Sequence, residues 1–327
     1  MKHGRLHSTL LILIGAQRLL GQDLSLDLPR ASEPNLVLRL GGEVDSDQGR
    51  LAEGRLSWQP TLNTQLSAGY TYSTLASTNA SHTDTRIVSL SGEHSFGAFG
   101  VGGGFDRAVV REQFSSNTFS LRPFFEHGAW RFEVSGSHRK TDFEHIGFEN
   151  VPIIRPSGTL YVTGSAQLNL TTTGLGGVID YMGETWHVYA AYDGYRHGDF
   201  EGTTRVSALR DGSGRLGTPI FNALAGRLVT RLQRLAGSRA TAKAGLLDYS
   251  AVLGLDVTIK AFRVGLEVNR DKDHLTGNVS DGVMSTLSLD ATRRLTVELL
   301  GGATQSEMLG TIRFVGLSLV FRTRPRL

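Results

Sequence analysis

Alternation of apolar and polar residues with a period of two is the feature that most constrains the fold of this chain. From Leu36 to Leu40 every second residue is leucine, and Arg39 lies between two of them. The same pattern returns in the segments 52–58, 66–73, 130–135, 262–269 and 295–299. Because successive side chains of a β-strand point to opposite faces, the pattern predicts strands with one apolar and one polar face.

The connections between these segments alternate in length. Short ones are predicted at 60–63, 97–98, 127–129, 183–185, near 260 and at 293–294, and longer ones at 76–85, 142–167, 199–247 and 272–282. Barrels that span a membrane have short turns at one end and longer loops at the other. The sequence therefore predicts an all-β fold, a transmembrane antiparallel up-and-down β-barrel of about 14 strands.

A soluble β-sandwich is the alternative, because its strands alternate in the same way. A sandwich rarely needs so many strands of about ten residues, the length that crosses a bilayer at a tilt, so the barrel is preferred. One hairpin gives a check of the register. If residues 184–185 form its turn, Tyr181 faces Val188. Asp180 then faces Tyr189, and the polar and apolar faces of the two strands coincide.

The N-terminus has the parts of a secretory signal peptide. Lys2 and Arg5 precede an apolar run at 10–14 that is too short to span a bilayer. Cleavage between Ala16 and Gln22 is expected. The alternative to a signal peptide is that this segment is the N-terminal helix of a cytosolic protein. The predicted organisation is a signal peptide at 1–22, a short periplasmic segment at 23–35, the barrel at 36–321 and a tail at 322–327.

Near the C-terminus, a glycine is followed by hydrophobic residues three and five positions later, the second of them aromatic: Gly316, Leu319 and Phe321. In this the segment 314–321 resembles the closing strand of Gram-negative outer-membrane β-barrels, whose final aromatic residue is read by the assembly machinery. Two features depart from the family pattern. Phe314 stands where a polar residue is usual, and the chain continues to Leu327. The resemblance implies a porin-like barrel in the bacterial outer membrane.

The polar faces of the strands are predicted to face the barrel interior and are rich in charge, with acidic residues in excess. Charges inside a membrane need water or partners. Two arrangements stay open: a hydrated pore, or a narrow interior that salt bridges fill. The pore is preferred, because a barrel of about fourteen strands leaves room for some water. The predicted pore-lining residues are Arg39, Glu43, Glu53, Arg55, Arg122, Arg131, Glu133, Asp180, Asp193, Asp256, Arg263, Glu267 and Glu298.

The segment Thr218 to Ala236 breaks the strand pattern. Leu224, Leu228 and Leu232 recur at helical spacing, and Pro219 suits the first helical turn. We expect one short helix in a long outer loop. Three roles stay open for it: a gate over the mouth, a basic helix on anionic lipopolysaccharide, or packing on the barrel rim.

Side chains suited to catalysis do not converge in the predicted strands. Ser135 and Ser137 point to the opposite face from His138. Asp180 and His187 share an inner face as a diagonal pair, but this pattern alone is weak. We therefore expect no enzyme, no catalytic residue, no cofactor and no metal site.

The leading functional hypothesis is a porin-like outer-membrane barrel that passes small hydrophilic solutes or ions. A non-conducting structural or interaction barrel is the second hypothesis, and a barrel enzyme that acts on lipid or protein is the third. Expected partners are outer-membrane lipid, lipopolysaccharide, the assembly machinery and small hydrophilic solutes. The 34 basic and 31 acidic residues nearly balance, which argues against binding to nucleic acid.

Overall fold

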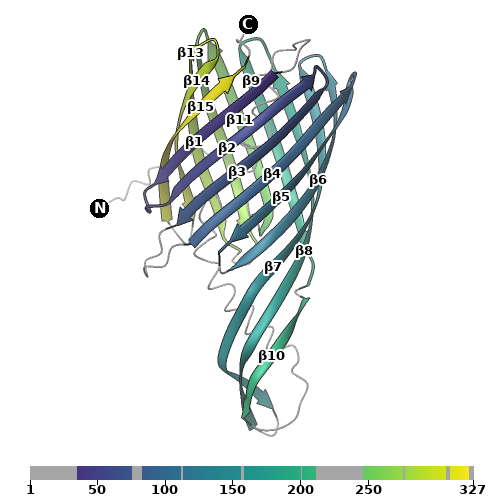
Figure 1. The fold of residues 1–327 in the computed structure, drawn as a ribbon, viewed down its shortest axis with the longest axis vertical. Coiled ribbons are helices and arrows are strands. Elements are labelled where there is room, and N and C mark those ends of the chain that lie inside the picture. The colour runs from purple at the N-terminus through teal and green to yellow at the C-terminus, as the bar shows by residue number, and fades with distance from the viewer. Residues whose placement is uncertain are drawn as a thin grey trace, which may run out of the picture.

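The computed structural model describes residues 35–75, 83–111, 113–155, 158–199, 201–210, 246–274, 277–306 and 310–323. They form a single antiparallel sheet (Figure 1). Its strands are β1 (Asn35–Asp45), β2 (Arg50–Thr61), β3 (Thr64–Leu75), β4 (Thr83–Phe96), β5 (Phe99–Val110), β6 (Phe114–His127), β7 (Trp130–Arg155), β8 (Gly158–Met182), β9 (Trp186–His197), β10 (Glu201–Arg210), β11 (Leu247–Ile259), β12 (Phe262–Asp273), β13 (Val279–Thr292), β14 (Leu295–Ser306) and β15 (Gly310–Arg322).

The sheet closes on itself into a barrel of 14 strands, as the alternation predicted. The first and last strands meet in antiparallel register, with Leu38 opposite Phe321. On the far side, β8 pairs with β7 on one edge and with β9 on the other, so the ring has no open gap. Closure satisfies the backbone groups that an open sheet would leave unpaired along its edge strands.

The strand β10 is the member of the sheet that lies outside the ring. It pairs with residues 161–169 of β8, whereas β9 pairs with residues 172–182 of the same strand. The strands β7 and β8 are 26 and 25 residues long and continue well beyond the barrel wall. With β10 they form a projecting three-stranded ribbon, seen at the bottom of Figure 1.

This ribbon corrects one prediction. The segment 142–167 was expected to be a long outer loop, and that expectation is wrong, because β7 and β8 pair almost throughout it and leave only residues 156–157 between them. The ladder breaks register twice here, between Phe143 and Ile146 and between Phe148 and Val151. A register shift interrupts the regular pairing of opposite residues, so the period of two is lost from the sequence although the backbone pairing continues.

The predicted short connections are confirmed. They lie at 62–63, 97–98, 128–129, 183–185, 260–261 and 293–294 and share one end of the barrel with Asn35 and Arg322, which we call the turn end. The opposite end, with the connections at 46–49, 198–246 and 274–278, is the loop end. Gly97 and Gly128 have φ of 74° and 61° in the tightest turns, a conformation that favours glycine.

Some predictions fall on parts of the chain outside the described residues. These are the signal peptide and its cleavage site, the helix expected at Thr218 to Ala236, and most of the tail at 322–327. Within the described part of the chain, no helix is long and apolar enough to cross a membrane.

Candidate functional site

The two faces of the barrel wall differ sharply in chemistry. On β1, Leu38 and Leu40 are 37% and 46% exposed on the outside, whereas Val37 and Arg39, which alternate with them, are 1% and 6% exposed on the inside. The same alternation continues around the ring. An apolar outer face in contact with solvent would be unfavourable, so the distribution is that of a wall between lipid and a polar interior.

Aromatic side chains gather on the outer face at the turn end. Each lies in or beside a strand terminus at that end and is at least 41% exposed. Aromatic girdles of this kind mark the interface between hydrocarbon and headgroups in membrane barrels. The members of this aromatic girdle are Trp58, Phe96, Phe99, Trp130, Trp186, Phe262 and Phe321.

Arg131 of β7 is the centre of one charge cluster inside the barrel. Its Nη1 and Nη2 donate to the two carboxylate oxygens of Glu93 at 2.9 and 2.8 Å. The same two nitrogens also reach Glu126 and Glu133, both at 3.3 Å. The guanidinium lies 3.8 Å above the ring of Phe124. One cation therefore neutralises only part of the charge of three carboxylates, near the turn end.

A second charge cluster joins three strands around the closure of the barrel. Nη2 of Arg39 on β1 lies 2.7 Å from Oε2 of Glu298 on β14, and Nε lies 3.8 Å from Glu53 on β2. On the neighbouring positions, Thr296 donates to Asp290 at 2.6 Å, and Arg322 donates to Thr296 at 2.7 Å. These side chains cross-link the inner faces of the first and last strands.

The third cluster surrounds His187 on β9. Its Nε2 lies 2.8 Å from Asp180 and its Nδ1 lies 3.2 Å from Asp256, which confirms the predicted diagonal pair and adds a second carboxylate. The imidazole stacks on Tyr189 with ring centroids 5.1 Å apart. The hydroxyl of Tyr189 donates in turn to Glu267.

The second and third clusters meet at one interior cavity. Arg39 and Glu298 line it from β1 and β14, and Tyr189, Asp256 and Glu267 line it from β9, β11 and β12. Arg263, a predicted pore-lining residue, is also in its wall. The cavity volume is about 40 Å³. A buried water needs at least ~10–15 Å³ by this measure, so the cavity is large enough to admit water.

An apolar cluster adjoins this cavity on the inner face. Met284 belongs to both the cluster and the cavity wall. Phe314, the residue that departs from the closing-strand pattern, is 8% exposed and packs into the same cluster. A large ring is accommodated there because its neighbours are apolar rather than charged. The buried members are Val178, Ala191, Val252, Met284 and Phe314.

All thirteen predicted pore-lining residues lie on the inner face of the wall, by the alternation of exposed and covered positions along their strands. The structure brings nine of them into the clusters and the cavity just described: Arg39, Glu53, Arg131, Glu133, Asp180, Asp256, Arg263, Glu267 and Glu298. The other four are Glu43, Arg55, Arg122 and Asp193, and Arg55 lies directly opposite Arg39 on the neighbouring strand. Asp193 accepts a hydrogen bond from Ser135 at 3.1 Å. Whether water and solutes reach all thirteen stays a prediction.

Sequence reasoning did not single out the polar partners that complete these clusters. Tyr189 and Thr296 carry no charge, so a search for charged inner positions passes over them. His197, Asp248 and His274 were not considered as a group, because no spacing in the sequence connects them.

No family model and no curated protein matches this chain. Among solved structures, the CymD monoaromatic hydrocarbon channel is similar over 96% of this chain and 94% of its own, with a TM-score of 0.53 and 11% identity. OccK3 (OpdO) of Pseudomonas aeruginosa has a TM-score of 0.39 and 9% identity over 90% and 96% of the two chains. CdiB from Acinetobacter baumannii has a TM-score of 0.42 and 12% identity over 89% of this chain, which spans 60% of the length of CdiB. The likeness to CymD shows the fold.

Proposed function

We propose that this chain is an outer-membrane channel for small hydrophilic solutes or ions. The observation that carries the proposal is the contrast between the two faces of one closed wall. The outer face is a continuous apolar surface with an aromatic girdle, and the inner face holds a charged cavity. A closed barrel with these faces is stable in a bilayer and gives polar species a path that avoids hydrocarbon.

The strand lengths support a membrane location. Strands β1 to β6 have 11 to 14 residues, and a tilted strand needs about 9–11 residues to cross a bilayer. The predicted export signal and the exposed position of Phe321 on the outer face, at 41% exposure, fit delivery to the outer membrane by the assembly machinery. Contacts with membrane lipid and lipopolysaccharide are part of the proposal.

The size and lining of the cavity support a narrow class of solutes. The cavity is small and is lined mainly by charged and polar side chains, which suits ions and small polar solutes. CymD is named for monoaromatic hydrocarbons. The cavity here is lined by Arg39, Glu298, Asp256 and Glu267, whose charges favour hydrated ions over apolar rings.

A non-conducting barrel is the second candidate, and the burial of the inner charges favours it. Glu133 and Glu298 are 5% and 8% exposed and lie within ion-pair distance of Arg131 and Arg39. Ion pairs that fill the lumen would brace the wall and stop conduction. The two candidates make different predictions for current through a bilayer.

The test is the reversal potential of the purified barrel in planar bilayers under a KCl gradient. The inner face carries an acidic excess, so the channel is expected to prefer K⁺ over Cl⁻, more strongly at low salt, where the Debye length is long. Glu267→Gln removes a negative charge from the cavity and should reduce this preference. Asp281→Asn removes the same charge from the rim, where the side chain is 47% exposed, and should change it less.

Two results would contradict the proposal. If heat-modifiable, correctly folded protein gives no current, the non-conducting barrel is the better account. A preference for Cl⁻ would show that the inner face presents net positive charge to the solutes, against the distribution of side chains described above.

A further inference from the structure

Three side chains that are far apart in the sequence meet at the loop end of the barrel. His197 is the last residue of β9, Asp248 is the second residue of β11, and His274 directly follows β12. These three strands are consecutive neighbours in the barrel wall. The apolar outer face of β9 ends at Tyr192, so the group lies beyond the lipid-facing region.

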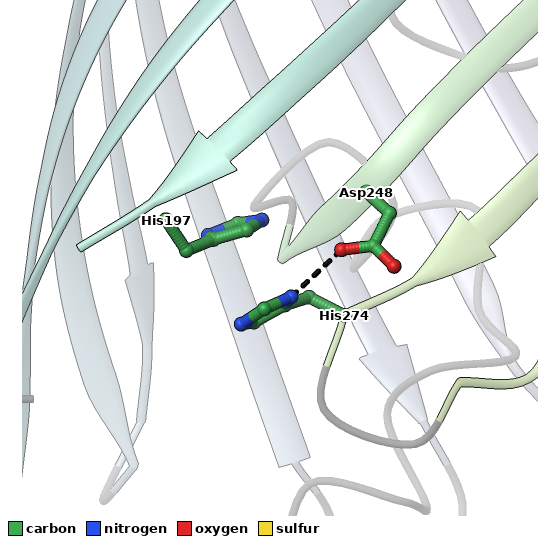
Figure 2. Close-up of side chains that lie close together, drawn as sticks. All are labelled: His197, Asp248 and His274. Atoms are coloured by element: carbon green, nitrogen blue, oxygen red, sulfur yellow. Dashed lines mark hydrogen bonds and ion pairs between the residues drawn. The ribbon is translucent and has the colours of Figure 1, made fainter. Parts of the chain in front are cut away.

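The two imidazoles and the carboxylate form a compact group (Figure 2). The rings of His197 and His274 are stacked, with centroids 3.8 Å apart and planes inclined by 19°. Nδ1 of His274 lies 2.7 Å from Oδ1 of Asp248. One donor atom from each of the three residues lies within 4.8 Å of the other two. All three side chains are half-buried, so one side of the group is open to solvent.

Neighbouring groups hold these side chains in place. Nδ1 and Nε2 of His197 lie 2.9 Å from the Thr172 hydroxyl and from the Leu247 carbonyl oxygen, respectively. Asp248 is held by Lys272, whose Nζ lies 2.8 Å from Oδ2 and leaves Oδ1 directed to His274. Metal-binding histidines typically have one ring nitrogen fixed by a hydroxyl, carbonyl or carboxylate and the other on the metal. In His197 the Thr172 hydroxyl would fix Nδ1, and Nε2 would exchange the Leu247 carbonyl oxygen for the ion.

From this geometry we propose that His197, Asp248 and His274 bind a divalent transition-metal ion, of which Zn²⁺ is the representative. Two imidazole nitrogens and one carboxylate oxygen suit Zn²⁺, Ni²⁺ or Cu²⁺, whereas Ca²⁺ and Mg²⁺ prefer oxygen ligands alone. In a tetrahedral site with bonds of about 2.0–2.1 Å, donor atoms lie roughly 3.3 Å apart. Binding would therefore require the side chains to rotate and draw their donor atoms closer than the present separations of up to 4.8 Å.

The bound ion would cross-link three adjacent strands at the point where two loop-end connections, at 198–246 and 274–278, leave the wall. A fourth ligand would come from solvent on the open side of the group. The site is separate from the charged cavity and requires no conduction. It revises the expectation from the sequence that the chain has no metal site.

The test uses the full chain in detergent, without a polyhistidine tag, treated with EDTA and then dialysed. Calorimetric titration with ZnCl₂ should show one saturable site, and Co²⁺ in its place should give the visible absorption of a tetrahedral centre. His197→Gln and His274→Gln should each weaken Zn²⁺ binding by more than about 100-fold, since loss of an outer-shell partner alone costs roughly 10- to 100-fold. Thr172→Val removes an outer-shell partner of His197 and should weaken Zn²⁺ binding by roughly 10- to 100-fold.

Controls separate this site from other histidines and from simple charge attraction. His127→Gln removes an exposed histidine at the turn end and should titrate like the wild type. Heat-modifiability on gels verifies that each variant is folded. The proposal fails if folded wild type binds no Zn²⁺, if the His197→Gln and His274→Gln proteins bind it unchanged, or if MgCl₂ binds equally well. None of these outcomes bears on the channel proposal, because binding in detergent is independent of current.

Discussion

Arg39 and Glu298 pair across an intervening strand: Nη2 of Arg39 on β1 lies 2.7 Å from Oε2 of Glu298 on β14, and β15 runs between them. Both side chains are at most 10% exposed. The pair therefore joins the beginning of the chain to its end on the inner face, at the place where the barrel closes.

Replacing one member of this pair should destabilise the barrel more than replacing both members with apolar residues. Arg39→Met leaves the carboxylate of Glu298 buried without its partner, and loss of one member of a buried pair costs about 3–5 kcal/mol. Arg39→Met combined with Glu298→Leu should recover most of that loss. Urea unfolding in lipid vesicles, followed by tryptophan fluorescence, measures the free energy of unfolding. Equal stability of the single and double variants would mean that the Glu298 carboxylate carries no penalty when it loses Arg39.

The short connections at the turn end predict that this end faces the periplasm and that the loop end faces outward. A single cysteine can be placed at Asp47→Cys in the 46–49 connection of the loop end, or at Asn63→Cys at the turn end; both positions are exposed, and the chain has no cysteine of its own. Membrane-impermeant maleimide should label Asp47→Cys on intact cells and Asn63→Cys only after permeabilisation. Labelling in the reverse order would show that the barrel has the inverted orientation. Labelling of both positions on intact cells would contradict the proposed topology.

Phe321 should matter for assembly beyond its contribution to the apolar surface. Phe321→Ala is expected to lower the amount of folded, heat-modifiable protein and to leave aggregate in the periplasm. Phe262→Ala is a matched control, since Phe262 is a similarly exposed member of the aromatic girdle on an internal strand. If the two variants reduce the folded fraction equally, the C-terminal resemblance has no role in assembly.

Gly254 makes room for Tyr189 on the inner face. A Cβ at Gly254 would overlap the Tyr189 ring, so Gly254→Ala must displace the ring or shift the backbone. Overpacking of this kind costs about 1–3 kcal/mol, and the displaced ring should also change the single-channel conductance. Gly136→Ala is the control, because its Cβ would meet nothing within 4 Å. Unchanged stability and conductance in Gly254→Ala would show that the Tyr189 position is not fixed by the glycine.

Much of the barrel could be predicted because the period of two is a local signal with a direct structural meaning. The hairpin around 184–185 shows this: Tyr181 pairs with Val188 and Asp180 with Tyr189, as the alternation required. The ribbon of β7 and β8 could not be predicted, because its register shifts remove the period while its backbone pairing continues.

The candidate sites were predictable only in part, for a different reason. Alternation tells which face a side chain occupies, so Arg39 and Glu298 were both placed inside. It does not tell which distant strand supplies the partner, since that depends on closure and stagger. The group of His197, Asp248 and His274 forms because the ends of three strands lie side by side in the barrel wall. No spacing of residues in the sequence indicates that these ends are adjacent.

The most direct test of the central claim is whether current passes through the interior that holds the charged cavity. Ser288 lines the cavity and is 8% exposed, and its neighbour Leu287 is 43% exposed on the outer face. Single-channel recordings of Ser288→Cys and Leu287→Cys, before and after a small cationic methanethiosulfonate reagent, compare the two faces at one level of the wall. The account predicts a stepwise loss of conductance in Ser288→Cys and none in Leu287→Cys. Conductance that persists in fully modified Ser288→Cys would contradict a path through this cavity.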